Sequence, residues 1–465
     1  MKVLMINASS PDPETPREYT LGIPYLVSAI RADGPYDIQV LDYFNRPWRE
    51  TEKSTVAMLE SFQPEVVLIS CFTINRIAGC KTAGLVKEYN PSVKVVMGGF
   101  HPSFMYRQIL THYPVDAVCI GEGEQTVVEL LQAYKAKVSV AGVRGIAYKK
   151  DGVIVQTGKR SFIKELDTIP FPAHDVYSDY IKKNKQGNII SSRGCPFGCQ
   201  FCSTTEFWGR KWRERSVKNV VDEIEMLVKN YSVEHINFMD DEFTLNRIRA
   251  IGISREIIKR SLKIDWICST RVSSVDRELL DWMKSSGCKH VALGVESGSP
   301  KILESTGKKI TVEQIIKGFE LLREYGLSRG VFLMVGNPGE NRSTVRETIR
   351  LVKRLRLEVD SVAVAEIYPG SRLYEMAKSK RFITDDYWLA ENPPPFYTVE
   401  QSAEKLQWWS FLIVLSSKRD QGVLTLARFL GWYLLSKRKK IMKYMVRVLD
   451  IFFLGKKKDH SYKKY

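Results

Sequence analysis

The first third of the chain alternates short runs of apolar residues with longer stretches in which apolar positions recur every three or four residues. A short apolar run is typical of a strand buried on both faces, and the longer repeat is typical of a helix that covers one of those faces. The predicted strands span residues 2–6, 37–41, 65–69, 93–97 and 116–120. The alternation therefore predicts a doubly wound α/β domain, with a ligand crevice at the carboxyl ends of its parallel strands.

A second alternation of strands and helices starts near residue 188 and predicts a separate α/β domain. Its predicted strands span residues 188–192, 235–239, 265–270, 290–294, 330–335 and 361–367. Parallel strands separated by helices in this number favour a partial (β/α)6 barrel. Functional side chains are then expected at the carboxyl ends of the strands.

The two alternations are joined by a predicted hairpin, with strands at 146–148 and 153–155, and by a proline-containing linker at 166–175. After residue 375 the alternation ends and helical patterns follow. The predicted organisation is an α/β domain at 1–140, a hairpin and linker at 141–180, a partial barrel at 181–375 and a basic helical region at 376–465.

The composition is that of a globular chain, because 44% of its 465 residues are hydrophobic. Its eight cysteines are sparse for this length, and no signal-peptide pattern precedes the apolar run at 3–6. The sequence therefore predicts a cytoplasmic protein whose thiols are reduced.

Most of the positive charge lies at one end of the chain. The net charge is +17, and residues 401–465 hold fifteen Lys or Arg against four Asp or Glu. A nucleic-acid groove spread over the fold would distribute its basic residues along the chain, whereas here they are concentrated in one terminal region. No nucleic-acid partner is therefore expected.

The same terminal region carries apolar, helix-length segments at 408–415, 423–435 and 441–454, with basic runs at 437–440 and 456–458. None reaches the length of a membrane-spanning helix. Two interpretations stay open: a helical cap on the barrel with a solvated basic face, or an interfacial anchor on anionic lipid. We favour the anchor, which predicts peripheral attachment to the inner face of the membrane.

Three cysteines, Cys195, Cys199 and Cys202, fall within eight residues of the predicted barrel domain. A disulfide is not expected in a reducing compartment, and a structural zinc site would need a fourth ligand at comparable spacing. Three thiolates around a [4Fe–4S] cluster would leave one iron open for a further ligand. A zinc site and a chance cluster are the alternatives.

The spacing Cys195-x3-Cys199-x2-Cys202, with the aromatic Phe201 before the third cysteine, resembles the signature of the radical S-adenosylmethionine (SAM) superfamily. The resemblance implies that the three thiols hold a [4Fe–4S] cluster whose open iron binds SAM. It also implies reductive cleavage of SAM to a 5′-deoxyadenosyl radical, and a low-potential electron donor such as ferredoxin or flavodoxin.

The resemblance assigns SAM-binding roles at the ends of further barrel strands. Acidic residues after the second strand would bind the SAM amino group, although the usual Gly-Gly-Glu form is absent. Arg271 would pair with the carboxylate, and Phe201 would lie along the adenine. The implied SAM-binding residues are Phe201, Asp240, Asp241, Glu242, Arg271, Glu296, Ser297 and Gly336.

The first domain lacks the glycine-rich fingerprint of dinucleotide binding after its first strand. The segments "SCFT" at 70–73, "GGFHPS" at 98–103 and "GEGE" at 121–124 instead resemble the Rossmann-like cobalamin-binding domain of cobalamin-dependent radical SAM enzymes. The implied cobalamin-binding residues are Ser70, Thr73, Gly98, Gly99, His101, Gly121 and Glu122. No Asp-x-His-x-x-Gly motif is present, so no histidine is expected on cobalt, and a scaffold without cobalamin remains an alternative.

The combined resemblance implies methylation of an unactivated carbon, and the apolar tail suggests a lipid or isoprenoid-like substrate. Relatives with the same cofactors carry out ring closure or carbon–carbon coupling, so these reactions stay open. A non-catalytic, cobalamin- or redox-responsive membrane module is a further alternative. The sequence identifies no catalytic residue beyond cofactor binding.

Overall fold

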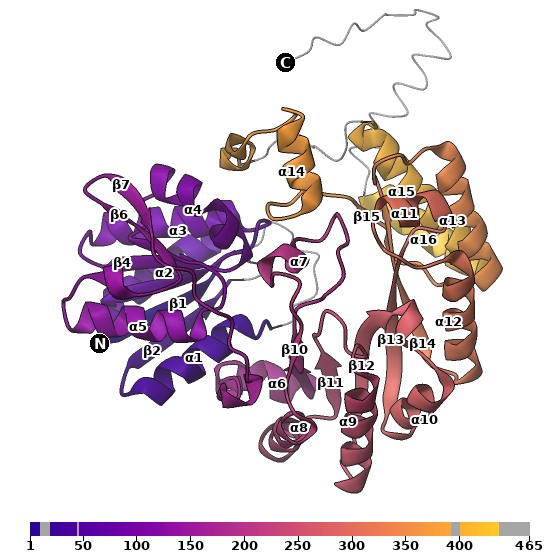
Figure 1. Cartoon of the computed structure of the whole chain (residues 1–465), viewed down its shortest axis with the longest axis horizontal. Coiled ribbons are helices and arrows are strands. Elements are labelled where there is room, and N and C mark those ends of the chain that lie inside the picture. Colours follow the sequence, from indigo (N-terminus) through magenta and orange to yellow (C-terminus); the bar gives the residue numbers. More distant parts are fainter. Residues whose placement is uncertain (10–18, 44–45, 392–399, 437–465) are drawn as a thin grey trace, which may run out of the picture.

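The computed structural model describes residues 1–9, 19–43, 46–391 and 400–436. Two α/β units lie side by side, and the helices that follow the second unit lie near the top of the view in Figure 1. The segment at 441–454 and the basic runs at 437–440 and 456–458 lie outside the described residues.

The first unit is built on a seven-stranded sheet in the order β2-β1-β3-β4-β5-β6-β7. The five predicted strands are confirmed as the parallel strands β1 (Lys2–Asn7), β2 (Asp37–Asp42), β3 (Val66–Ser70), β4 (Lys94–Gly98) and β5 (Ala117–Cys119). The predicted hairpin forms β6 (Ile146–Lys150) and β7 (Val153–Gln156). Since β6 pairs antiparallel with β5, the hairpin extends this sheet and belongs to the first unit.

Helices cover both faces of this sheet, as continuous apolar strands require. One face packs against α1 (Gly22–Asp33) and α5 (Glu124–Lys135). The other packs against α2 (Trp48–Phe62), α3 (Arg76–Tyr89) and α4 (Phe100–His112). The carboxyl ends of the strands face the second unit.

The second unit is a half-barrel of six parallel strands in the order β15-β14-β13-β12-β11-β8. The strands are β8 (Gln186–Ile189), β11 (His235–Phe238), β12 (Asp265–Arg271), β13 (Cys288–Glu296), β14 (Ser328–Val335) and β15 (Ala363–Val364). The last is shorter than the predicted span of 361–367, and the predicted first strand, 188–192, is displaced, because β8 ends at Ile189. The covering helices are α8 (Val217–Tyr231), α9 (Arg247–Lys259), α10 (Arg277–Ser285), α12 (Val312–Glu324) and α13 (Arg342–Leu355).

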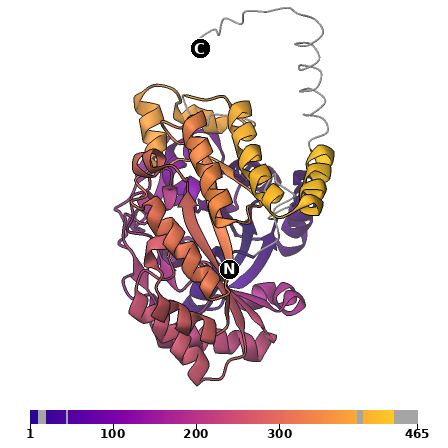
Figure 2. The same ribbon diagram turned by 90° about the vertical axis from the view of Figure 1, so that its right-hand side faces the viewer.

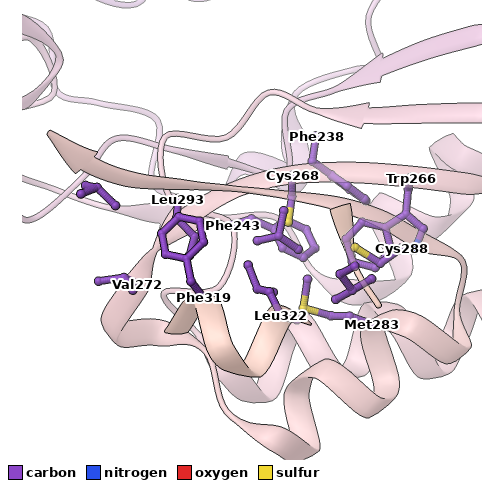
Figure 3. Packing of buried hydrophobic residues seen from close by; sticks show 14 of the residues in the cluster. Phe238, Phe243, Trp266, Cys268, Val272, Met283, Cys288, Leu293, Phe319 and Leu322 are labelled. Carbon is purple, nitrogen blue, oxygen red and sulfur yellow. The ribbon is translucent and has the colours of Figure 1, made fainter. Parts of the chain in front are cut away.

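The outer face of the half-barrel sheet forms the largest apolar core of the described chain. Figure 3 shows Cys268 and Cys288 inside this packing, near Phe243 and Trp266. Both thiols are buried and belong to the core between strands and helices. These two cysteines are therefore packing residues, and they lie on the face of the sheet opposite the barrel lumen.

The chain then returns to the first unit. After β15, α14 (Arg372–Ser379) and the 3-10 turn at Asp385–Leu389 pack against α4 through a small apolar core. Arg76 of α3 donates hydrogen bonds to the carbonyls of Trp388, at 2.8 Å, and Ala390, at 2.6 Å. This connection joins the end of the half-barrel to the first unit.

Two further helices complete the described chain. α15 (Ala403–Asp420) packs against α13, and α16 (Val423–Ser436) follows it at the edge of the molecule, as the turned view in Figure 2 shows. Among the described residues, no helix combines the length and apolar character that crossing a membrane requires.

Candidate functional site

The three clustered cysteines lie on an irregular loop between β9 (Ser192–Arg193) and α7 (Ser203–Phe207), at the carboxyl end of the half-barrel. Cys195 and Cys202 are partly exposed, and Cys199 is buried. The loop begins at Gly194, whose φ of +89° and close approach to the Lys211 carbonyl, 2.1 Å from an added Cβ, exclude any other residue. The loop geometry is thus fixed by backbone contacts.

Burial and nearby charges act in opposite directions on the pKa values of these thiols. Burial raises the pKa of the Cys195 thiol to about 12, and the nearby Asp241 adds to this effect. Burial also raises the pKa of Cys199, but the positive charges of Lys308 and Arg271 oppose it. The negative charge of a thiolate in this loop therefore has to be balanced by positive charge, either from bound metal ions or from Lys308 and Arg271.

Within the described part of the chain, no three His, Cys, Asp or Glu side chains converge on a point that would suit a single metal ion. A [4Fe–4S] cluster does not require such convergence, because each cysteine ligates a different iron. The Cys202 thiol lies near enough to act electrostatically on both Cys195 and Cys199, so the three thiols share one loop environment.

Of the acidic residues after β11, Asp240 is committed to the fold. Its Oδ2 accepts a 3.1 Å hydrogen bond from the Ser191 backbone N–H, and its Oδ1 accepts from the Ser191 hydroxyl at 2.8 Å. The Ser192 hydroxyl also donates to Oδ1. Asp240 thus ties the end of β8 to the end of β11 and has little capacity left for a ligand.

Asp241 has the opposite surroundings, since its carboxylate faces the cavity between the two units. The protein around this concave wall raises the pKa of Asp241 to about 6, chiefly by desolvation and then by the neighbouring Asp240. Glu242 is buried, and its Oε1 accepts hydrogen bonds from Thr270 at 2.5 Å and Thr244 at 3.3 Å. Asp241, which also accepts a hydrogen bond from the Gly194 backbone N–H, is the member of the predicted trio that lines the cavity.

Arg271 lies beside the cysteine loop, as the sequence predicts for a SAM-binding residue. Its guanidinium stacks 3.8 Å from the centre of the Phe197 ring, and its Nη1 lies 4.0 Å from the Cys199 sulfur. Nη2 donates to the Lys308 carbonyl, whereas the buried Nε has no partner among the described residues. The unpartnered Nε is available to an anionic ligand.

Glu296 ends β13 with a left-handed φ of +67°, which is strained for a glutamate. Its Oε1 forms a 2.8 Å ion pair with Lys308, a buried lysine that sequence reasoning missed. The Ser297 hydroxyl is also buried, and it contacts the Thr348 hydroxyl at 3.2 Å. Glu296 therefore stays beside the cysteine loop, while Ser297 anchors the strand end to α13.

The turn after β14 places Gly336 and Asn337 at the carboxyl end of the barrel. Gly336 has a φ of +99°, and a Cβ added there would lie 3.1 Å from Leu406 of α15. Asn337 is buried, and neither its amide oxygen nor its amide nitrogen has a partner among the described residues. Such an orphan amide suits the hydrogen-bonding edge of a bound base.

Phe201 packs against the apolar core at α14.

A cavity of about 340 Å³ lies between the strand ends of the first unit and the half-barrel. Of the seven residues implied for cobalamin, five line it: Ser70, Gly98, Gly99, Gly121 and Glu122. A Cβ added to Gly99 would lie 2.5 Å from the Cys71 carbonyl, so the backbone can approach a ligand closely here.

Thr73 and His101 do not line this cavity. The His101 Nδ1 lies 3.2 Å from the Thr73 hydroxyl, and its ring packs edge-on against Trp388. Burial lowers the pKa of His101 to about 3, so the ring is neutral. His101 joins the first unit to the segment after α14.

The carboxylate of Glu122 is already paired, although the residue reaches the cavity wall. Arg193 donates to its Oε1 at 2.8 Å and Arg213 donates at 2.9 Å, while the Ile163 backbone N–H donates to Oε2 at 2.8 Å. Arg193 also pairs with Glu124 at 2.6 Å. We call these four charged residues the interdomain ion cluster, which joins the first unit to the strand before Cys195.

An aromatic stack on the cavity wall was not predicted from the sequence. Phe72 and Phe100 of the first unit stack at 5.9 Å, and Phe100 stacks on Phe207 of the half-barrel at 4.1 Å. All three rings line the cavity. Their positions in separate segments left no local sequence signal.

Comparisons with known proteins agree with both halves of this arrangement. The family model of the radical SAM superfamily matches residues 189–352, and that of the B12 binding domain matches residues 16–131. An uncharacterized methyltransferase of Pyrococcus horikoshii is 35% identical over 372 residues, which cover 79% of this chain and 80% of that protein.

The chain belongs to the cobalamin-dependent radical SAM enzymes.

This radical SAM enzyme is also similar to a cyclase and to a methyltransferase of known structure. The anaerobic magnesium-protoporphyrin IX monomethyl ester cyclase of Rubrivivax gelatinosus is 32% identical over 375 residues, covering 78% of this chain and 67% of the cyclase. The solved structure of the radical SAM methyltransferase TsrM from Kitasatospora setae, with cobalamin and a [4Fe–4S] cluster bound, has a TM-score of 0.70 at 19% identity. The structural match covers 86% of this chain and 80% of TsrM, so the two proteins share a fold.

The cofactors of this radical SAM enzyme are a [4Fe–4S] cluster, SAM and cobalamin. Enzymes of this class take an electron from a reductant such as ferredoxin or flavodoxin. The residues present fit the three groups: the three free thiols of one loop suit the cluster, the orphan polar atoms of Arg271 and Asn337 suit SAM, and the glycine-lined cavity suits part of cobalamin.

Proposed function

We propose that this enzyme methylates an unactivated carbon of an apolar, lipid- or isoprenoid-like substrate held in the barrel lumen. The observation that carries the proposal is a set of exposed apolar side chains on the inner wall of the half-barrel, away from the charged groups at the carboxyl ends of the strands. Large apolar side chains on this wall are unusually exposed: Phe332 by 52%, Ile267 by 37% and Met239 by 37%. Exposed apolar area grouped on a concave wall is typical of a site that an apolar ligand covers.

The alternation of side chains along the strands supports the inward orientation of this wall. In β12, Trp266 and Cys268 belong to the outer core, so Ile267 between them points to the lumen. In β14, Leu333 and Val335 belong to the outer core, so Phe332 points to the lumen as well. The exposed residues therefore share one face of the sheet.

When bound, the cluster and SAM supply a hydrogen-abstracting radical, and cobalamin supplies the methyl group. The chain's own residues bind, orient and exclude water. Asp241 would hold the SAM ammonium, Arg271 its carboxylate and Asn337 the edge of its base. The apolar lumen would hold the substrate carbon against these groups and keep water away.

The relatives favour methylation and keep ring closure as a second candidate. The 35% identical relative is named a methyltransferase, and the 32% identical relative is named a cyclase. Both reactions begin with a radical on a substrate carbon. A substrate held in the lumen is therefore compatible with either reaction. The two differ in whether a methyl group reaches the substrate.

The test uses anaerobically purified full-length protein reconstituted with iron, sulfide and cobalamin, and supplied with SAM and a strong reductant. A lipid extract and a water-soluble extract are offered separately. Methylation of an apolar substrate predicts S-adenosylhomocysteine, 5′-deoxyadenosine and a product heavier by one CH₂, all dependent on the lipid extract. Deoxyadenosine without a methylated product would favour the cyclase reaction, and turnover with the water-soluble extract alone would overturn the apolar substrate.

We further propose that the apolar substrate is reached from a membrane surface. The support is α16, on which Val423 is 82% exposed and Leu424 is 76% exposed, in a terminal region of strongly basic composition. Apolar side chains beside basic ones suit the interface of an anionic bilayer. Full-length protein should co-sediment with anionic vesicles more than with neutral ones. Binding to RNA but to neither vesicle would contradict the proposal.

A further inference from the structure

Lys308 is a buried lysine beside the cysteine loop, in the turn between α11 (Pro300–Ser305) and α12. It is 6% exposed, and its Nζ lies 2.8 Å from the Glu296 Oε1. Removing an ammonium from water costs several kcal/mol unless a partner compensates. A buried lysine in this position therefore needs a structural or functional explanation.

The lysine ammonium occupies space that is open because residue 294 is glycine. A Cβ added to Gly294 would lie 2.6 Å from the Lys308 Nζ and 3.1 Å from the Glu296 Oε1. In β13 the flanking Leu293 and Val295 belong to the outer core, so a side chain at 294 would point into the lumen. The ion pair of Lys308 and Glu296 thus lies on the lumen side of the sheet.

The backbone around Lys308 supports the cysteine loop directly. The Gln200 backbone N–H donates to the Thr306 carbonyl at 2.9 Å, and Arg271 donates to the Lys308 carbonyl. A Cβ added to Gly307 would lie 3.2 Å from the Gly198 carbonyl, so the two loops are in close contact. The same Arg271 places its Nη1 4.0 Å from the Cys199 sulfur, so the turn that carries Lys308 lies beside this cysteine.

We propose that Lys308 is a positioning residue of the SAM site. Its ammonium holds the Glu296 carboxylate in one orientation at the strained end of β13, and it fixes a positive charge beside the Cys199 thiolate. Glu296 is then ready to bind the ribose hydroxyls of SAM, and the charge favours the reduced, more negative state of the cluster. The inference is independent of the identity of the methylated substrate.

The experiment compares four variants of the full-length, reconstituted enzyme in the absence of substrate; one of them, Lys308→Arg, restores the charge. Lys308→Met removes the charge. Gly294→Ala keeps the charge but displaces the flexible end of the lysine, because its new Cβ takes the space of Nζ. Lys309→Met is the control, since the neighbouring Lys309 is exposed. The measurements are iron content, the SAM dissociation constant, and the midpoint potential from a reductive titration followed by electron paramagnetic resonance.

We expect Lys308→Met to keep its iron, to bind SAM about tenfold more weakly and to have a more negative midpoint potential. Gly294→Ala should also weaken SAM binding, and Lys308→Arg should restore the potential. Lys309→Met should match the parent enzyme. Unchanged SAM affinity and potential in Lys308→Met would overturn the proposal. Loss of iron in both Lys308→Met and Gly294→Ala would instead assign Lys308 a purely structural role.

Discussion

At the scale of single residues, the two adjacent aspartates after β11 show how neighbours of the same type take different roles. Asp240 accepts hydrogen bonds from the backbone and hydroxyl of Ser191 and from Ser192. Asp241 faces the cavity instead, and desolvation raises its pKa to about 6. A carboxylate that is exposed to a concave site, yet poorly solvated, gains most from a cationic ligand.

The first prediction separates these two roles. Asp241→Asn should weaken SAM binding about tenfold, because the ammonium loses a charged partner, and should leave the melting temperature near that of the parent enzyme. Asp240→Asn should lower the melting temperature, because buried donors on Ser191 and Ser192 lose their charged acceptor, at a cost of about 2 kcal/mol. Equilibrium dialysis and thermal unfolding measure the two effects. The assignment fails if Asp240→Asn alone weakens SAM binding.

At the scale of elements, the turn between β14 and α13 is held by a buried carboxylate. Glu340 is 2% exposed, and it accepts hydrogen bonds from the backbone N–H groups of Gly336 and, at 3.3 Å, Asn337. Burial raises its pKa from 4.5 to about 7, although these two donors oppose the shift. The turn that presents Asn337 to the site therefore includes a carboxyl group that titrates near neutral pH.

The second prediction follows from this raised pKa. The folded protein keeps a proton on Glu340 between pH 4.5 and about 7, where the unfolded chain releases it. This group therefore makes the free energy of unfolding fall as pH rises through that window, by on the order of 3 kcal/mol. Glu340→Gln stays neutral and should remove the fall. The free energy of unfolding of Glu340→Gln minus that of the parent enzyme should therefore be more positive at pH 8 than at pH 5.

Urea unfolding at the two pH values provides the measurement. Glu304→Gln is a suitable control, because Glu304 is exposed in the same region of the barrel. A difference between Glu340→Gln and the parent enzyme that does not change with pH would contradict the prediction.

At the scale of the whole molecule, charged and apolar contacts hold the two units together around the cavity. The interdomain ion cluster pairs Glu122 with Arg193 and Arg213 in buried surroundings. The Arg213 guanidinium also lies over two rings that contact each other, 4.9 Å from the centre of Phe162 and 5.2 Å from that of Trp208. Because Arg193 directly precedes the cysteine loop, these contacts couple the cobalamin-binding unit to that loop.

The third prediction tests this coupling. Glu122→Gln should leave two buried arginines short of negative charge, lower the stability by about 3 kcal/mol and weaken retention of cobalamin. Thermal unfolding and cobalt content after gel filtration measure the two effects. Glu225→Gln serves as the control, because the ion pair between Glu225 and Lys229 lies at the surface. A parent-like melting temperature for Glu122→Gln would show that the cluster is dispensable.

The strands and the cysteine motif could be predicted because their signals are local. Apolar runs identified the five parallel strands of the first sheet and the six of the half-barrel, with β15 shorter than expected. The hairpin was also predicted, but not its place in the first sheet, because pairing between β5 and β6 is a contact between segments. Helices after residue 375 were predicted, and the packing of α15 on α13 agrees with the alternative of a helical cap on the barrel, which was not the favoured interpretation. The packing of α14 on α4 was not predicted.

The sequence by itself determined the family, the two α/β units and the motif of three closely spaced cysteines, because spacing and periodicity are properties of neighbouring residues. Only the tertiary structure decided which side chains remain free to bind. It paired Glu122 with arginines, turned His101 away from the cavity and left Asp241 open. It also brought Lys308 to Glu296. Burial and ion pairing depend on residues far apart in the chain, so no local pattern encodes them.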